Sequence, residues 1–339
     1  MQLAEFDCPF DPSLIAERPV EPRDQARLLV APKSGGPLTH KKVADLPDLL
    51  AEGDLLVVND SKVMAARLTG RKRPGGGKVE LLLVRPLGPD TWEALVKGRM
   101  KQGQVIDLDA RTNVTVLAQG PTGSTVQFSS AQTAADVMNL LGQMPLPPYI
   151  KREPVEQDRT WYQTIFARPE GSIAAPTASL HFTEGLRAAL RGRGIGLATV
   201  TLHVGPGTFR PVTSDRIEDH VMYPERFEVP EATVEAIRRA KAAGKRVVAV
   251  GTTVVRTLEA SAAEAGTVRP IIGDTALFIT PGYRFRVVDA LMTNFHLPRT
   301  TLVMLVAAFM GLEPLRAAYE EAVKEKYRFY SYGDAMLVP

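Results

Sequence analysis

A short stretch near the carboxyl end of the chain, TNFHLPRTT at 293–301, gathers side chains that can do chemistry. Its hydrogen-bonding residues include Thr293, Asn294, His296 and Arg299. They precede a nearly unbroken apolar run, 302–312, which is too short to span a bilayer and predicts a buried helix. Helix amino ends attract anions, because their first N–H groups are unpaired and the macrodipole is positive there. The stretch therefore predicts an anion-binding helix start beside an imidazole.

A second stretch, TVTLHVGPGTFRPV, carries His203 from a β-rich run directly into Gly205 and Gly207. Ligands of open α/β sheets bind beyond the carboxyl ends of strands. Glycines at such a position let the backbone come close to a ligand. The alternative interpretation is a tight turn that follows a core histidine.

A third stretch, VVAVGTTVVRTLEA, repeats this arrangement with an apolar strand, Gly251, and then Thr252 and Thr253 at a helix start. The two hydroxyls either cap the helix or join its N–H groups in binding a carboxylate or phosphate. Arg256 lies one turn further and can add a guanidinium to an anion.

Two remaining polar clusters are less easily assigned. AAPTASLHFT alternates polar with apolar residues, and on a strand its polar residues would share one face, either a ligand-binding or a solvated one. Those polar residues are Thr177, Ser179, His181 and Thr183. YRFYSYGDAMLVP ends the chain with polar and aromatic residues around Gly333, namely Arg328, Ser331, Tyr332 and Asp334.

Several standard motifs are missing from the sequence. RPGGGKVE lacks the spacing of a phosphate-binding loop, and neither RGRGIG nor HVGPGTF fits the dinucleotide-binding pattern. There is no C-x-x-C, H-E-x-x-H or G-x-S-x-G, and the five histidines show no ligand-like spacing, so we expect no metal site. The single cysteine, Cys8, excludes an internal disulfide and is expected to be inert.

The pattern of elements changes twice along the chain. From about 70 to 148, short apolar runs alternate with Gly, Pro, Asp and Asn at about ten-residue spacing, which is typical of a small barrel or sandwich. After 180, helix-like EGLRAALRGRG, PEATVEAIRRAKAAG and TVVRTLEASAAEAG alternate with strand-like IGLATVTLHV, KRVVAV and TALFIT. GDLLVVND, before 70, also reads as a buried strand.

These patterns predict a mixed α/β main domain that is built from both chain ends, with a small β-barrel inserted into it. The expected segments are 1–69 and 150–339 for the main domain and 70–149 for the barrel. Prolines at 145, 147, 148 and 154 stiffen the return linker.

Charge and composition favour a cytoplasmic protein with no membrane span. The amino terminus contains three early carboxylates and no apolar signal, and a single cysteine fits a reducing compartment. The net charge is only +3, but Lys and Arg cluster locally at 71–78, 97–101, 187–193 and 238–246. These clusters are either ordinary solvated surface or contacts to a phosphate backbone.

Long blocks of the sequence resemble one known family in order and over nearly the whole chain, from about 3 to 338. The blocks are DLLVVNDSKVMAARLTGRK, GGKVELLL, MPLPPYIKR, AAPTASLHFT, TLHVGPGTFRPV, AVGTTVVRTLEA, TNFHLPRTTLVMLVAAFMG and YRFYSYGDAML. They resemble the S-adenosylmethionine:tRNA ribosyltransferase-isomerase family of queuosine biosynthesis. Members of this family pair an α/β domain with an inserted β-barrel.

The resemblance implies an enzyme with two substrates. S-adenosylmethionine would be the co-substrate, and the partner would be tRNA bearing 7-aminomethyl-7-deazaguanine at the wobble position. The ribosyl group moves to the aminomethyl group and rearranges to the epoxycyclopentane of epoxyqueuosine, while adenine and methionine leave. We expect a monomer or weak oligomer.

The sequence departs from the family pattern at one position. Family members typically read H-x-M-H-x-E where this chain has HVMYPE, so that His220, Met222 and Glu225 fit and Tyr223 replaces a histidine. A phenol is a poor base at neutral pH, which argues against a mechanism that needs an imidazole at this position.

The chemistry implied by the resemblance selects candidate residues. A sulfonium acidifies the C5′ protons, so a general base is expected, and departing adenine needs a proton. The catalytic candidates are His181, His203, His220 and His296, of which His203 and His296 are favoured because each follows an expected strand. The candidates for substrate binding are Asn59, Arg67, Thr177, Gly205, Gly207, Glu225, Thr252, Thr253, Arg256, Asp289, Asn294, Arg299, Arg328, Tyr332 and Asp334.

Some of these candidates carry a specific expected role. Glu225, Asp289 or Asp334 would accept paired hydrogen bonds from the deazaguanine. Around TNFHLPRTT, Asn294 and His296 would face the substrates, Arg299 would reach a carboxylate or phosphate, and Thr300 would cap the helix.

Two other classes fit the residues without the resemblance. A sugar-phosphate isomerase or nucleoside hydrolase would also use strand-end histidines and helix amino ends but would not need tRNA. A non-catalytic RNA-binding module would bind tRNA without turnover.

Overall fold

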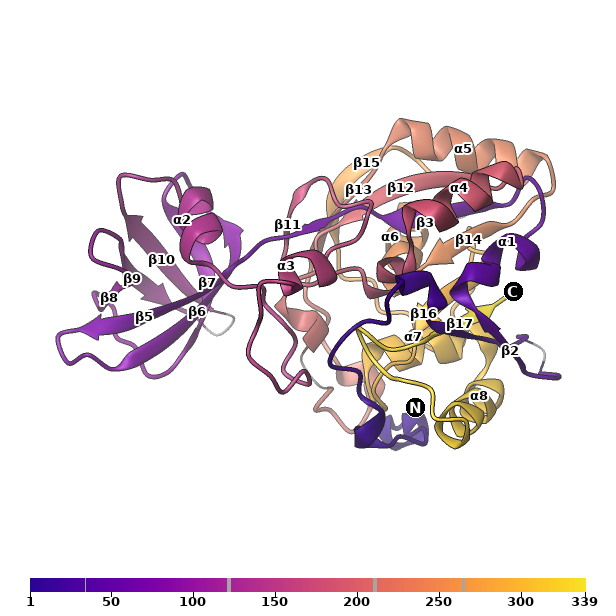
Figure 1. The fold of residues 1–339 in the computed structure, drawn as a ribbon, viewed down its shortest axis with the longest axis horizontal. Coiled ribbons are helices and arrows are strands. Elements are labelled where there is room, and N and C mark those ends of the chain that lie inside the picture. Colours follow the sequence, from indigo (N-terminus) through magenta and orange to yellow (C-terminus); the bar gives the residue numbers. More distant parts are fainter. Residues whose placement is uncertain (34, 121–122, 210–211, 264–265) are drawn as a thin grey trace.

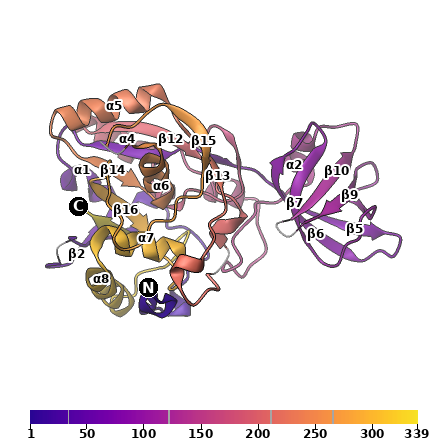
Figure 2. The ribbon, with the colours of Figure 1, turned by 180° about the vertical axis from the view of Figure 1, so that it is seen from behind.

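The computed structural model describes residues 1–339 except 34, 121–122, 210–211 and 264–265. A barrel lies to one side of a larger α/β body, and both chain termini belong to the larger body (Figure 1). The same separation is visible from behind (Figure 2). This arrangement confirms the expected mixed α/β fold with a small barrel inserted between two chain segments.

The main sheet has nine strands among the described residues and draws on both ends of the chain. In spatial order they are β15 (Ile271–Thr275), β13 (Glu225–Val229), β12 (Gly196–Leu202), β3 (Leu55–Asn59), β14 (Val247–Val250), β16 (Ala290–Asn294), β17 (Ala335–Val338), β1 (Arg27–Val30) and β2 (Thr39–Lys42). The four central strands β12, β3, β14 and β16 are parallel to their neighbours within this group. Their carboxyl ends therefore meet at one edge of the sheet.

The central strand β3 is buried on both faces. Leu55 and Val57 belong to one hydrophobic cluster, and Leu56 and Val58 belong to a second cluster on the opposite face. This division follows from the alternation of side chains along a strand. It explains why a fully apolar run was needed here, since each face is covered by protein.

Helices cover both faces of the sheet. Those of the main body are α1 (Leu46–Leu49), α3 (Asp158–Trp161), α4 (Glu184–Gly192), α5 (Glu231–Ala242), α6 (Thr252–Ser261), α7 (Thr301–Met310) and α8 (Leu312–Lys324). The apolar run 302–312 forms most of α7, and the Thr300 hydroxyl accepts the Val303 N–H, as expected for its cap. No single described helix is long and apolar enough to cross a membrane; α7 and α8 pass such a test only together and are bent by 114°.

The inserted barrel closes through six antiparallel strands of the described chain, in the order β10-β7-β6-β5-β8-β9. They are β5 (Arg67–Arg73), β6 (Lys78–Pro86), β7 (Thr91–Lys97), β8 (Val105–Asp107), β9 (Asn113–Gln119) and β10 (Ser124–Ser129), followed by α2 (Ala134–Leu141). Alternate residues of β6, namely Val79, Leu81 and Leu83, fill its separate core. Strand β5 crosses the expected boundary between 69 and 70.

The chain enters and leaves the barrel at one narrow junction. Arg67 and Gln143 exchange backbone hydrogen bonds of 3.2 and 2.8 Å. A Cβ at the neighbouring Gly142 would lie 1.9 Å from the carbonyl oxygen of Ala65, so only glycine fits. Beyond the junction, β4 (Lys62–Val63) and β11 (Glu170–Ser172) pair in parallel.

Two expectations about local structure were wrong. Thr177–His181 forms a 3₁₀ helix and not a strand, and Ser179 and His181 are buried, which also excludes a solvated face for them. The turn follows Pro176, whose carbonyl accepts the Ser179 N–H. A strand was also expected in TALFIT, residues 275–280. The observed strand β15 covers residues 271–275, where it pairs with β13, so only Thr275 of the expected segment lies in a strand.

Candidate active site

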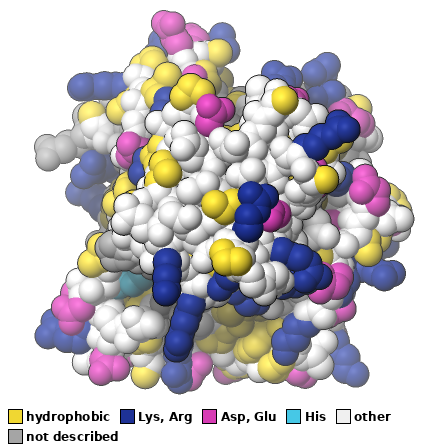
Figure 3. Space-filling model, turned by 90° about the vertical axis from the view of Figure 1, so that its left-hand side faces the viewer, with side chains coloured by type: hydrophobic (Ala, Val, Ile, Leu, Met, Phe, Trp, Pro, Cys, Tyr) yellow, Lys and Arg dark blue, Asp and Glu magenta, His cyan; other side chains and the backbone are white. Residues whose placement is uncertain are grey.

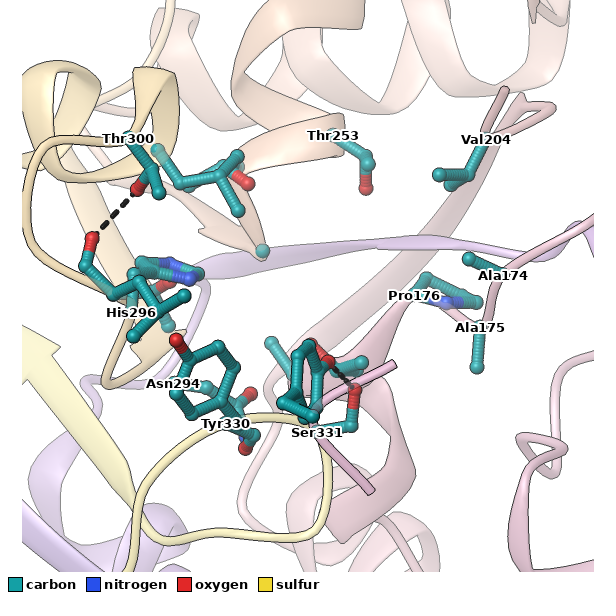
Figure 4. Close-up of a pocket in the computed structure, with 18 of the residues that line it drawn as sticks. Ala174, Ala175, Pro176, Val204, Thr253, Asn294, His296, Thr300, Tyr330 and Ser331 are labelled. Atoms are coloured by element: carbon teal, nitrogen blue, oxygen red, sulfur yellow. Dashed lines mark hydrogen bonds between the residues drawn. The ribbon is translucent and has the colours of Figure 1, made fainter. Parts of the chain in front are cut away.

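A cavity of about 680 Å³ opens at the carboxyl edge of the parallel strands. Strands β14 and β16 end here, and helices α6 and α7 begin here. The cavity is lined by Leu3, Pro148, Tyr149, Tyr162, Ala174–Ala178, Val204, Val212, Gly251–Thr253, Arg256, Thr293, Asn294, His296–Thr300, Leu302, Tyr330 and Ser331. Figure 4 shows ten of these residues labelled around the open space. Seven of the candidate residues from the sequence line it: Thr177, Thr252, Thr253, Arg256, Asn294, His296 and Arg299.

The start of α6 contributes one wall. Gly251 is the amino cap at φ 98°, a conformation that suits glycine, so neither threonine is the capping residue. The Thr253 hydroxyl accepts a long hydrogen bond of 3.4 Å from the Asn59 amide. Asn59 itself is fully buried and joins β3 to the Leu202 backbone, which gives this candidate a structural role.

His296 is the buried imidazole of the cavity. Its Nε2 lies 2.8 Å from Thr293 Oγ1, and its backbone N–H donates to the Tyr319 hydroxyl at 2.8 Å. Burial lowers the pKa of His296 to about 4. The ring is therefore neutral at pH 7 and can accept a proton or a hydrogen bond.

Asn294 lies beside His296 with its amide held in one orientation. Its Nδ2 donates to the Tyr330 carbonyl at 2.9 Å. Its Oδ1 is buried and makes no hydrogen bond of good geometry among the described residues, but Asn294 lies close enough to the His181 ring to raise the pKa of that histidine against the effect of burial. His181 therefore contacts a residue of the cavity wall, although it does not itself line the cavity.

Arg256 and Glu225 form a buried ion pair beside the cavity, with 6% and 4% exposure. Arg256 also donates from Nε to the Leu277 carbonyl at 3.1 Å. The other carboxylate oxygen of Glu225 accepts the Gly205 N–H at 2.8 Å. The pair therefore fixes the loop after β12 against α6, and the guanidinium charge is already compensated.

Arg299 lies at the mouth of the cavity and is about half exposed. The Arg299 guanidinium pairs with the carboxylate of Asp7, and the backbone N–H of Arg299 donates to the Phe6 carbonyl at 3.0 Å. The amino-terminal segment is thereby held against the cavity, where Leu3 lines the wall. Binding of a substrate anion by Arg299 stays a prediction and would require a change of partner.

The other histidine candidates lie outside the cavity. His203 directly follows β12, but Val204 lines the cavity, and neighbouring residues of an extended chain point to opposite sides. His181 is buried next to Arg23 and Arg328 around a small neighbouring hollow, and burial lowers its pKa to about 4. The ring of His220 packs on that of Phe278 at 5.4 Å, and burial lowers its pKa too.

Other substrate-binding candidates make structural bonds. Gly207 lines a small second hollow that also includes Tyr223 and Arg256. Arg67 donates to the Leu146 carbonyl at 2.8 Å at the barrel junction. The Tyr332 hydroxyl donates to the buried Asp158 at 3.1 Å.

The carboxylates proposed for the deazaguanine also have protein partners. Asp289 accepts from Lys241 at 2.6 Å and from the Val247 N–H at 2.7 Å. Asp334 accepts from the backbone N–H of Arg328 at 2.8 Å and from the Arg328 guanidinium at 3.2 Å. No carboxylate occurs among the described residues that line the cavity.

Three cavity tyrosines were missed from the sequence, namely Tyr149, Tyr162 and Tyr330. Tyr149 and Ser331 share a hydrogen bond of 2.6 Å, drawn as a dashed line in Figure 4. The aromatic cluster at the chain end was a signal for Tyr330, whereas Tyr149 and Tyr162 lie far from it in sequence.

No metal site and no reactive thiol are evident in the described part of the chain. No group of three or more His, Cys, Asp or Glu is placed to hold a metal ion there. Burial raises the pKa of the Cys8 thiol to about 11, so it is protonated at neutral pH.

Buried neutral histidines make the stability of the fold depend on pH. His181 and His296 have pKa values near 4 when folded and about 6.5 when unfolded, so the unfolded chain binds more protons between these values. We expect the free energy of unfolding, measured with urea, to fall by about 1–2 kcal/mol per histidine from pH 7 to pH 5. His181→Gln should reduce this fall, and an unchanged free energy at pH 5 in the wild type would contradict the assignment.

The strand order, the cavity at the carboxyl edge and the inserted barrel define the class of this protein, a mixed α/β protein with a neutral imidazole and two helix amino ends around one cavity. Sequence comparison identifies the family within this class. The chain belongs to the queuosine biosynthesis protein family, whose model matches residues 3–338.

Individual relatives match this chain over nearly the whole length of both proteins. S-adenosylmethionine:tRNA ribosyltransferase-isomerase from Acidiphilium cryptum is 50% identical, covering 100% of this chain and 99% of the relative. The protein of the same name from Moorella thermoacetica is also 50% identical, covering 100% of both chains. A crystal structure of S-adenosylmethionine tRNA ribosyltransferase from Thermotoga maritima is similar with a TM-score of 0.57 and 38% identity, over 99% of this chain and 100% of that one.

Proposed function

We propose that this protein transfers and isomerises the ribosyl group of S-adenosylmethionine onto 7-aminomethyl-7-deazaguanine at the tRNA wobble position. The products are epoxyqueuosine-tRNA, adenine and methionine. The proposal rests mainly on the cavity of about 680 Å³ with neutral His296 in its wall, in a chain that the queuosine family model matches over residues 3–338. This volume is in the range of ligand pockets. The protein acts in the cytoplasm as a monomer or weak oligomer, without a metal.

His296 is the proposed general base for the C5′ proton. The sulfonium makes this proton acidic, and a neutral imidazole can accept it. The pKa of about 4 makes His296 a weak base, so the transfer depends on the acidity that the sulfonium gives to the C5′ proton.

Proton transfer to His296 converts the sulfonium into a neutral ylide and the imidazole into an imidazolium, so the total charge in the cavity does not change. The amino ends of α6 and α7 face the cavity, and no carboxylate lines it among the described residues. Arg256 and Arg299 also line the cavity, but each is paired with a carboxylate, Glu225 and Asp7 respectively. The helix amino ends favour a carboxylate, so we place the methionine carboxylate at Thr252 and Thr253.

The barrel is the proposed contact for the tRNA backbone. Residues 67–129 contain ten lysines and arginines against five aspartates and glutamates, whereas the whole chain has a net charge of only +3. The excess positive charge of the protein therefore lies in the barrel. Lys and Arg side chains are spread over the barrel end of the molecule in Figure 3. Such a surface supplies sequence-independent affinity for phosphates.

Tyr223 is compatible with this assignment of roles. It lies in the small hollow with Gly207 and Arg256 and does not line the main cavity among the residues described. A base at position 223 is not needed if His296 takes the C5′ proton.

Adenine release provides the test of the proposed function. Release from S-adenosylmethionine should require tRNA that carries the aminomethyl-deazaguanine, and mass analysis of the nucleosides should show epoxyqueuosine. Release without tRNA would favour a nucleoside hydrolase. Binding of this tRNA with no release would contradict the proposed enzyme and favour a binding module.

A further inference from the structure

Tyr330 has a strained backbone at the wall of the cavity. Its φ is 70°, a left-handed conformation that is uncommon for a bulky residue and costs energy. The described residues other than glycine with positive φ are Arg299, Lys326 and Tyr330, and two of these three line the cavity. Strained residues of this kind are concentrated at functional sites.

Several contacts stabilise this conformation of Tyr330. The Tyr330 N–H donates to the Phe295 carbonyl at 3.1 Å, and the Tyr330 carbonyl accepts from Asn294 Nδ2 and from the Gly333 N–H, both at 2.9 Å. The Tyr330 ring packs on that of Tyr149 with centroids 4.0 Å apart. The surrounding structure therefore holds both the backbone and the ring in place.

The hydroxyl of Tyr330 makes no hydrogen bond that would stabilise the described part of the fold. The side chain is 8% exposed, and its buried hydroxyl has no hydrogen-bond partner among the described residues. In Figure 4 this hydroxyl points toward the wall that carries His296. The hydroxyl of Tyr149, in contrast, is bonded to Ser331. Burial raises the pKa of Tyr330, so the phenol keeps its proton and is available as a donor.

We propose that the Tyr330 phenol is a catalytic residue that donates a hydrogen bond to the adenosyl part of the substrate. This inference rests on the proposed function. The phenol stays protonated throughout, and its donor complements His296, which acts as the acceptor on the same wall. The strain at Tyr330 places this donor before the substrate arrives.

The test compares Tyr330→Phe with Tyr327→Phe. Tyr327 is a buried tyrosine three positions earlier, whose hydroxyl lies 2.8 Å from His40 Nδ1, away from the cavity. Tyr330→Phe should leave the urea midpoint unchanged, because no protein hydrogen bond is lost, and should slow adenine release by about 10- to 100-fold. Tyr327→Phe should lower the urea midpoint and leave the rate unchanged.

A full rate of adenine release in Tyr330→Phe would overturn the inference. So would a loss of rate in both variants in proportion to their loss of stability. If the wild type itself releases no adenine, the proposed function fails separately, and the affinity for S-adenosylmethionine, measured by calorimetry, then tests the proposed hydrogen bond. Equal affinities of wild type and Tyr330→Phe would contradict this hydrogen bond, and weaker binding by the variant would support it.

Discussion

Replacing His296 with glutamine should lower the single-turnover rate of adenine release by about 100- to 10,000-fold, which is the range for loss of a general base. Glutamine keeps polar atoms near Thr293 Oγ1, which bonds the imidazole at 2.8 Å, but it cannot accept a proton at neutral pH. The fold should survive, because the backbone N–H of residue 296 still donates to Tyr319.

Two further histidine variants make this result specific. His40 is partly exposed and contacts Tyr327 and Glu321 away from the cavity, so His40→Gln should keep the full rate. His203→Gln should lose less than His296→Gln, because His203 does not line the cavity in the described structure. A full rate in His296→Gln together with a large loss in His203→Gln would reassign the base to His203.

Replacing Glu225 with glutamine should reduce the free energy of unfolding by about 3–5 kcal/mol, the usual cost of removing one partner from a buried ion pair. Arg256 would keep its charge at 6% exposure without a carboxylate to compensate it. Because Glu225 also accepts the Gly205 N–H, the loop after β12 should loosen at the same time. Urea unfolding measures the first effect, and amide hydrogen exchange at Gly205 measures the second.

An exposed ion pair is the matched control for this variant. Glu235 and Arg238 form a pair one turn apart on α5, at 2.8 Å and largely exposed to solvent. Glu235→Gln should cost less than about 1 kcal/mol, since surface pairs contribute little. If Glu225→Gln cost no more than this control, the buried pair would not be what holds the loop to α6.

The parallel strands explain why some site residues were predictable. Gly251 and Asn294 end or follow apolar strands, and the carboxyl ends of parallel neighbours must meet at one sheet edge. A sequence that marks the strand ends therefore also marks residues that lie together. The family resemblance and the element pattern together gave the fold class and the family, and the structure and the comparisons confirm both.

The side on which a residue lies depends on local backbone geometry that spacing alone does not reveal. His203 follows β12, as expected, yet alternation turns Val204 and not His203 into the cavity. Thr177–His181 alternates like a strand but winds into a 3₁₀ helix after Pro176, and His181 is buried behind Asn294 without lining the main cavity itself.

The sequence by itself determined the alternation of strands and helices, the insertion of a barrel, the family and the strand ends that border the site. These follow from periodicity, turn residues and long matching blocks, all of which are local in the chain. Only the tertiary structure decided which polar groups are already paired and which are left for a ligand. Glu225, Asp289 and Asp334 are bonded within the protein, whereas the Tyr330 hydroxyl lies in the cavity wall without a described partner. Pairing and burial depend on contacts between segments far apart in sequence, such as residues 149 and 331, and these are fixed only when the chain has folded.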